Sequence, residues 1–137
     1  MGKFFSTELN EIIKYKRNEE LFRALKLKLN EPFQFQIIRD NNNKLIYKGI
    51  IKDGKCKGRG TLFENDIIYD GYFKEGKKEG FFIVKNKVTS KLIYEGFFKD
   101  NNYHGKGTLF DEEGNIKYEG HFKNGQYDGI GIQYRKN

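Results

Sequence analysis

Polar and apolar residues alternate along short segments of the chain, and each segment ends in residues typical of a tight turn. In Tyr118-Glu-Gly-His-Phe-Lys, the tyrosine, glycine and phenylalanine lie on one face of an extended strand, and the other three residues lie on the opposite face. Lys-Asn-Gly125 then supplies the dipeptide favoured in two-residue hairpin turns. A second extended segment, Gly131-Ile-Gln-Tyr134, follows. The pattern predicts a β-hairpin.

This hairpin unit occurs four times, with 22 to 25 residues between successive tyrosines. Counting from the glycine of each Tyr-x-Gly, further glycines recur at +5, +9 and +11, and 14 of the 16 glycines occupy such positions. Asn101 takes the +5 position of the third unit, and Phe82 takes the +11 position of the second. We expect the +5 residue to adopt a positive φ, which asparagine tolerates. The structural residues of the repeat are Tyr47 and Gly49, Tyr69 and Gly71, Tyr94 and Gly96, and Tyr118 and Gly120.

The segment before the first repeat predicts one more strand. Residues 33–39 align with the second strand of a repeat but lack its glycines, as expected of a terminal cap. We therefore expect residues 33–137 to form one elongated, twisted sheet of about nine antiparallel strands. Its repeats start near residues 47, 69, 94 and 118.

The first 32 residues predict a helical segment instead. Residues 6–29 contain neither glycine nor proline, and their apolar residues recur at helical spacing. Because a single-layer sheet cannot bury both of its faces, we expect this α-helix to pack on or beside the sheet. Docking of the helix on another protein, or on a second copy to form a homodimer, is the alternative.

Two segments carry a resemblance to a known family. Tyr94-Glu-Gly-Phe-Phe-Lys and Tyr118-Glu-Gly-His-Phe-Lys, with the glycines that follow them, resemble MORN repeats (membrane occupation and recognition nexus). The resemblance covers residues 45–134 and implies a mainly β fold of consecutive hairpins. It also implies association with cilia, the cytoskeleton or membrane-apposed structures. Phe82 and Ile51 depart from the repeat pattern, so we expect local irregularity there.

The two faces of the sheet predict different roles. One face is a row of rings and glycines that forms the structural side of each repeat. The other repeats an acid, an aromatic residue and a lysine, and accessible faces of repeat arrays commonly bind partners. The alternative is that the acids and lysines are ordinary cross-strand partners. The predicted partner groove contains Tyr72, Phe97 and His121, with Lys74, Lys99 and Lys123 on its rim.

Composition narrows the classes of function. Apolar residues make up 36% of the chain and charged residues 33%, which favours extensive exposed surface. His104, His121 and Cys56 fall in different repeats without nucleophile or metal-ligand spacing, so we expect no catalytic site, metal or cofactor. A single cysteine and the lack of a secretory signal favour an intracellular location. The net charge of +7 favours acidic partners, although we expect no nucleic-acid binding because no RNA-binding motif is recognised.

The sequence leaves two functions open. The first is a non-catalytic scaffold or adaptor that holds a peptide or helix of a protein partner in a larger intracellular assembly. The second is a peripheral module that binds an anionic membrane or phosphoinositides. Met1-Gly2-Lys-Phe-Phe-Ser6 fits the N-myristoylation pattern, so an acylated Gly2 together with lysines would provide the anchor.

Overall fold

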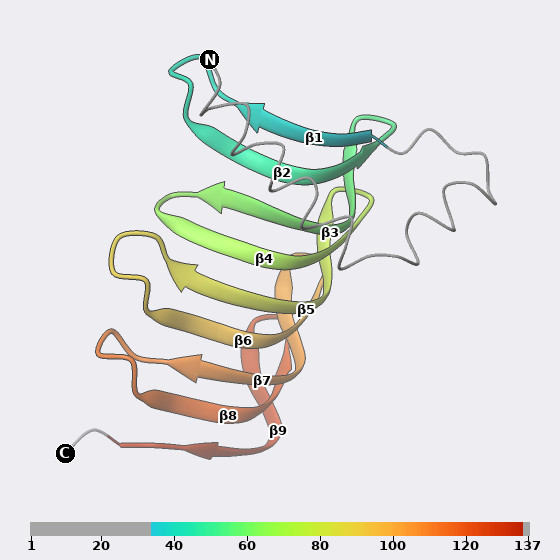
Figure 1. Cartoon of the computed structure of the whole chain (residues 1–137). Helices are drawn as coiled ribbons and strands as arrows, with labels where there is room; N and C mark the ends of the chain where they lie inside the picture. Colours follow the sequence, from blue (N-terminus) through green and yellow to red (C-terminus); the bar gives the residue numbers. More distant parts are fainter. Residues whose placement is uncertain (1–33, 136–137) are drawn as a thin grey trace.

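In a computed structural model of the chain, nine strands form one open antiparallel sheet (Figure 1). Each strand pairs with its neighbours in the sequence, so β1 (Gln34–Arg39) and β9 (Gln126–Gln133) form the two edges. This arrangement confirms the predicted mainly β fold and its nine strands. The strands between the edges are β2 (Leu45–Lys52), β3 (Lys55–Glu64), β4 (Ile67–Lys74), β5 (Lys77–Asn86), β6 (Leu92–Lys99), β7 (Asn102–Phe110) and β8 (Ile116–Lys123).

The structure describes residues 34–135, and this part of the chain contains no helix. The predicted helix over residues 6–29, the segment 1–32 to which it belongs and the candidate lipidation site Gly2 lie outside the described residues. The same holds for a homodimer formed through that helix. Those features stay predictions.

The hairpin turns within the repeats have positive φ at both central residues. Asp53–Gly54 has φ values of 51° and 74°, and Asn124–Gly125 has values of 50° and 81°. Such turns match the right-handed twist of the strands that they connect. In the third repeat Asp100–Asn101 adopts 48° and 69°, which confirms that asparagine replaces the +5 glycine without changing the turn.

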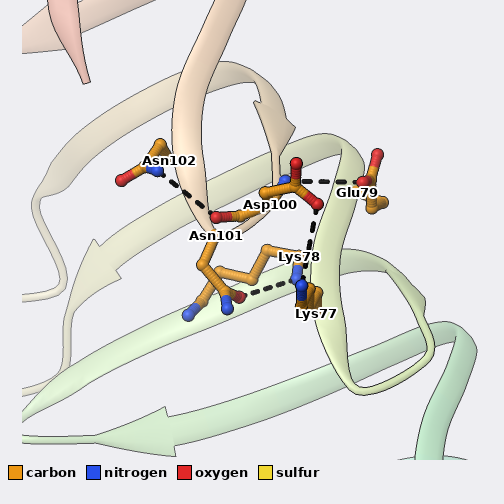
Figure 2. A network of polar contacts seen from close by, with 6 residues as sticks. All are labelled: Lys77, Lys78, Glu79, Asp100, Asn101 and Asn102. Carbon is orange, nitrogen blue, oxygen red and sulfur yellow. Dashed lines mark hydrogen bonds and ion pairs between the residues drawn. The ribbon is translucent and has the colours of Figure 1, made fainter. Parts of the chain in front are cut away.

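Neighbouring turns are also bonded to one another. The backbone N–H of Gly125 donates to the carbonyl of Tyr103 over 3.0 Å, and that of Asn101 donates to the carbonyl of Lys78 over 3.2 Å. Figure 2 shows how Asn101 adds a second bond, because its side-chain oxygen accepts from the backbone N–H of Lys78 over 2.9 Å. Lys77 and Asp100 form an exposed ion pair beside it, with 3.9 Å between Nζ and Oδ1. Each turn is thereby held against the turn of the preceding repeat.

The +9 glycines have a role that the spacing did not reveal, since they form β-bulges. Gly105 has φ 74° and Gly129 has φ 69°, and the pairing register shifts beside each of them. Between the pairs Gly96↔Gly107 and Phe98↔Tyr103, one residue of β6 faces three residues of β7. Bulges of this kind bend a strand, and Figure 1 shows the strands bending near their hairpin ends.

The core lies on one face of the sheet, and its repeated contact is a tyrosine ring over two paired glycines. Tyr94 is fully buried, and its hydroxyl donates to the Phe97 carbonyl over 2.8 Å. Its ring lies over Gly96 and Gly107, so a Cβ on Gly107 would overlap the ring. Tyr47 and Tyr118 lie over their own glycine pairs in the same way and donate to the carbonyls three residues later.

Phenylalanine rings join these tyrosines from one repeat to the next. Phe73 meets Tyr47 edge-to-face with 5.6 Å between ring centroids, and Phe122 meets Tyr94 in the same way at 5.5 Å. Edge-to-face pairs are favoured because the positive edge of one ring faces the negative face of the other. One continuous aromatic core therefore runs across the hairpins.

The second repeat uses a different ring for the same purpose. Phe82 replaces the +11 glycine, is fully buried and lies over Gly71. Tyr69 does not take that place, and its ring is instead 4.3 Å from the ammonium group of Lys78. Burial lowers the pKa of Lys78, because the charged form loses water. The irregularity expected at Phe82 is thus that the phenylalanine ring, in place of the Tyr69 ring, covers the glycine of this repeat.

The crowding above Gly107 yields a test of the core contact. Gly107 lacks a positive φ, so the cost of Gly107→Ala arises only from the overlap with Tyr94. We expect a loss of about 3 kcal/mol in the free energy of unfolding, measured by urea denaturation. The control is Gly54→Ala, where nothing lies within 4 Å and only the positive φ opposes alanine, at a cost of about 1 kcal/mol. Equal losses for the two variants would contradict the steric explanation.

A second test concerns the departure at Phe82. Phe82→Gly restores the repeat pattern, yet we expect it to destabilise the sheet by about 3–5 kcal/mol because it removes a fully buried ring. Urea unfolding followed by circular dichroism measures this loss. A variant as stable as the parent chain would mean that Tyr69 moves over Gly71 and that either ring suffices.

Candidate functional site

The face opposite the aromatic core, here called the open face, exposes large apolar side chains. Phe81, Phe97 and Ile130 are 44%, 47% and 85% exposed, and Tyr72 is exposed to a similar degree. Tyr72, Phe81 and Phe97 lie on the neighbouring strands β4, β5 and β6, and Ile130 lies on the edge strand β9. Phe81 pairs with Phe97, and their rings meet edge-to-face with 5.5 Å between centroids. The open face thus carries a cluster of exposed apolar side chains over β4 to β6 and a further one, Ile130, on β9.

The exposed rings belong to a row that crosses β4 to β9, here called the apolar row. Strands β4, β6 and β8 contribute the residue that follows the glycine of Tyr-x-Gly, and β5 and β9 contribute a bulge residue. Lys106 of β7 interrupts the row where it pairs with His121. The apolar row consists of Tyr72, Phe81, Phe97, His121 and Ile130.

A row of carboxylates lies beside the apolar row, two residues earlier along the even-numbered strands. Its members, here called the acid row, are Asp70, Glu95 and Glu119. Ile83 pairs with both Asp70 and Glu95, so one strand separates those two carboxylates. Thr108 pairs in the same way with Glu95 and Glu119. The register of the sheet therefore aligns one acid per repeat.

The two rows border a shallow hollow of about 640 Å³ over β5 to β9. Its floor is the glycine-containing backbone, and its walls combine apolar side chains with carboxylates. The side chains that line the hollow are those of Phe81, Glu95, Phe97, Lys106, Thr108, Glu119, His121, Ile130 and Ile132.

Three of the predicted groove residues fall in the apolar row, and two of them, Phe97 and His121, line the hollow. Tyr72 lies on the open face beside the hollow, against Gly80. The predicted rim lysines are exposed but do not line the hollow, since they lie at the hairpin ends of their strands: Lys74, Lys99 and Lys123.

Several residues of the hollow were not singled out from the sequence. Phe81 and Ile130 both occupy the +10 position of their repeats, between the +9 and +11 residues. This shared position is the only signal in the sequence that could have predicted their place in the hollow. Ile132 follows one residue after the +11 glycine of its repeat. Glu95 and Glu119 were considered only as partners of lysines, whereas the register places them in one row.

The carboxylates of the hollow differ in their contacts. Glu119 accepts a hydrogen bond from the hydroxyl of Tyr134, with 2.7 Å between the oxygens. This bond to a negative carboxylate raises the pKa of Tyr134. Glu95 makes no hydrogen bond or ion pair through its carboxylate within residues 34–135. The Glu95 carboxylate is therefore available to a ligand.

The arrangement does not favour nucleophilic or metal chemistry. Burial raises the pKa of the Cys56 thiol, which lowers the fraction of reactive thiolate. Within the described ranges, no three histidine, cysteine, aspartate or glutamate side chains come together as metal ligands would. Residues 34–135 also contain no helix with the length and apolar character needed to cross a membrane.

A comparison with family models agrees with the repeat pattern. The model of the MORN repeat matches residues 47–65, 69–81, 94–116 and 118–137, which together make up more than half of the chain. The matched segments begin at the four tyrosines of the Tyr-x-Gly units. No curated protein matches the chain.

The bond between Tyr134 and Glu119 yields a test of the electrostatics of the hollow. Tyr134 should ionise above the ordinary range of a tyrosine, because the Glu119 carboxylate favours the protonated phenol. Glu119→Gln should lower the pKa of Tyr134 toward its usual value, as followed by NMR titration of the ring. Glu95→Gln is the matched control and should leave it unchanged. A pKa that is insensitive to Glu119→Gln would contradict the bond.

Proposed function

The chain belongs to the MORN-repeat family, whose repeats act as protein- or membrane-binding modules, and from this premise we propose that it is a non-catalytic adaptor. It binds a segment of a protein partner on its open face. The observation that carries the proposal is the apolar row, which exposes large side chains on a face with no covering layer among the described residues. Large apolar side chains exposed together on one face mark interaction sites.

The rigidity of the face supports the same function. The strands under the hollow are paired on both sides from β5 to β8, and the aromatic core fixes them from below. A partner would therefore bind a preformed surface, which reduces the entropy lost on association. Phe97 and Phe81 are of the residue class that anchors interfaces.

The charges of the hollow favour a protein over a lipid surface. Among the side chains that line the hollow, the carboxylates of Glu95 and Glu119 outnumber the ammonium group of Lys106, and carboxylates are repelled by anionic headgroups. The lysines at the hairpin ends, Lys74, Lys99 and Lys123, lie outside the hollow and are the groups that a membrane would attract. The finer part of the proposal, a place in a larger intracellular assembly of the ciliary or cytoskeletal kind, is supported by the family resemblance.

Affinity capture with matched variants tests this function. A variant with Phe81→Ser, Phe97→Ser and Ile130→Ser should lose partners recovered by the parent chain by about tenfold or more, because the anchoring side chains are removed. The control replaces three exposed lysines by glutamine and should retain the partners: Lys74→Gln, Lys99→Gln and Lys123→Gln. Circular dichroism verifies that both variants are folded.

The opposite result would overturn the proposal. Partners that are retained by the serine variant and lost by the glutamine variant would place binding at the hairpin ends. Binding of the parent chain to vesicles of phosphatidylserine at physiological salt, abolished in the glutamine variant, would identify that binding as membrane binding.

A further inference from the structure

We propose that the partner segment is an amphipathic helix that lies across the strands, with basic residues at seven-residue intervals. This inference rests on the proposed function and specifies the chemistry of the partner. Its starting point is the pairing of an apolar row with an acid row on the open face.

The spacing of the acid row supplies the repeat length of the partner. Asp70 and Glu95 are two strands apart, as are Glu95 and Glu119. Neighbouring strands lie about 4.8 Å apart, so successive carboxylates recur about every 9.6 Å across the sheet. An α-helix advances about 10.5 Å over seven residues and returns to nearly the same side. Lysine or arginine at every seventh residue therefore meets one carboxylate per repeat.

The apolar row defines the other stripe of the helix. Phe97 and His121 lie two residues beyond Glu95 and Glu119, a shift of about 6.6 Å along the strands. A helix with its side chains is about 10 Å wide and covers both rows at once. Apolar residues three positions after each basic residue lie about 4.5 Å further along the helix, which is one strand further across the sheet. They would contact Phe81 and Ile130 of the apolar row, on either side of Lys106.

An extended partner fits this surface less well. A strand repeats its side chains on one face about every 6.8 Å, which does not match the spacing of the carboxylates. A polyproline II helix advances about 9.3 Å per turn, which matches it, but on any one side it presents only one side chain per turn. It would therefore meet one row and leave the other uncovered.

The acid row defines the length of helix that it can contact. Lys48 pairs with Thr61, which pairs with Asp70, so the equivalent position of β2 carries a lysine in place of a carboxylate. The acid row from Asp70 to Glu119 spans about 19 Å, the length of about 13 helical residues.

Three fluorescein-labelled peptides of 21 residues and one set of variants test the proposal. The first peptide has lysine at the first and leucine at the fourth position of each of three heptads, with alanine and glutamine elsewhere. The second has the same composition with the lysines five residues apart. The third is proline-rich with lysine at every third residue. Fluorescence anisotropy with the full chain measures each dissociation constant.

We expect the heptad peptide to bind at least about tenfold more tightly than the other two. Glu95→Gln with Glu119→Gln should weaken its binding by about tenfold, and so should a rise in salt. The matched control removes two exposed carboxylates outside the acid row, Glu75→Gln and Glu112→Gln, and should have little effect. Glu95→Lys with Glu119→Lys should reverse the preference toward a heptad peptide that carries glutamate.

Equal binding of the heptad and five-residue peptides would overturn the proposal, as would tighter binding of the proline-rich peptide. Captured partners that are lost with Phe81→Ser, Phe97→Ser and Ile130→Ser but kept with Glu95→Gln and Glu119→Gln would overturn the partner chemistry and leave the proposed function intact. Partners that are kept in both variants would overturn the proposed function as well.

Discussion

The tyrosine ring over a pair of glycines is the contact on which the rest of this sheet depends. A ring such as that of Tyr94 covers both strands of its own hairpin, because neither Gly96 nor Gly107 has a side chain in the way. In each of these repeats a tyrosine ring therefore covers the core face of its own hairpin. Phenylalanine rings in edge-to-face contact join the tyrosine of one repeat to that of the next. Within residues 34–135 the sheet thus buries one face without a second layer, and the opposite face is exposed.

The bulges also help to give the two faces of the sheet different roles. The positive φ of Gly105 or Gly129 lets three residues of one strand face a single residue of its neighbour, and the strands bend there. The extra residues project onto the open face, where Ile130 is the most exposed apolar side chain of the hollow. The bulge glycines thus help to build the candidate binding surface, whereas the other glycines of the repeat make room for the core rings.

Charge acts locally in this protein. The chain carries a net charge of +7, which by itself favours acidic partners. The open face nevertheless aligns Asp70, Glu95 and Glu119, because antiparallel pairing places equivalent residues of successive repeats in one row. A partner responds to the nearest charges, since more distant ones are screened by salt. In the proposed complex, the register of the sheet therefore matters more than the overall charge.

The sequence alone determined the strands, their order, the hairpin turns and the separation of the two faces, because period-two alternation and glycine spacing are local properties. It also placed Phe97 and His121 on the open face. The exchange of Tyr69 for Phe82, the bulge at the +9 position and the acid row were decided only by the tertiary structure. Each depends on which residues lie opposite one another on neighbouring strands. That register follows from the packing of rings against glycines across the whole sheet, and no single segment contains it.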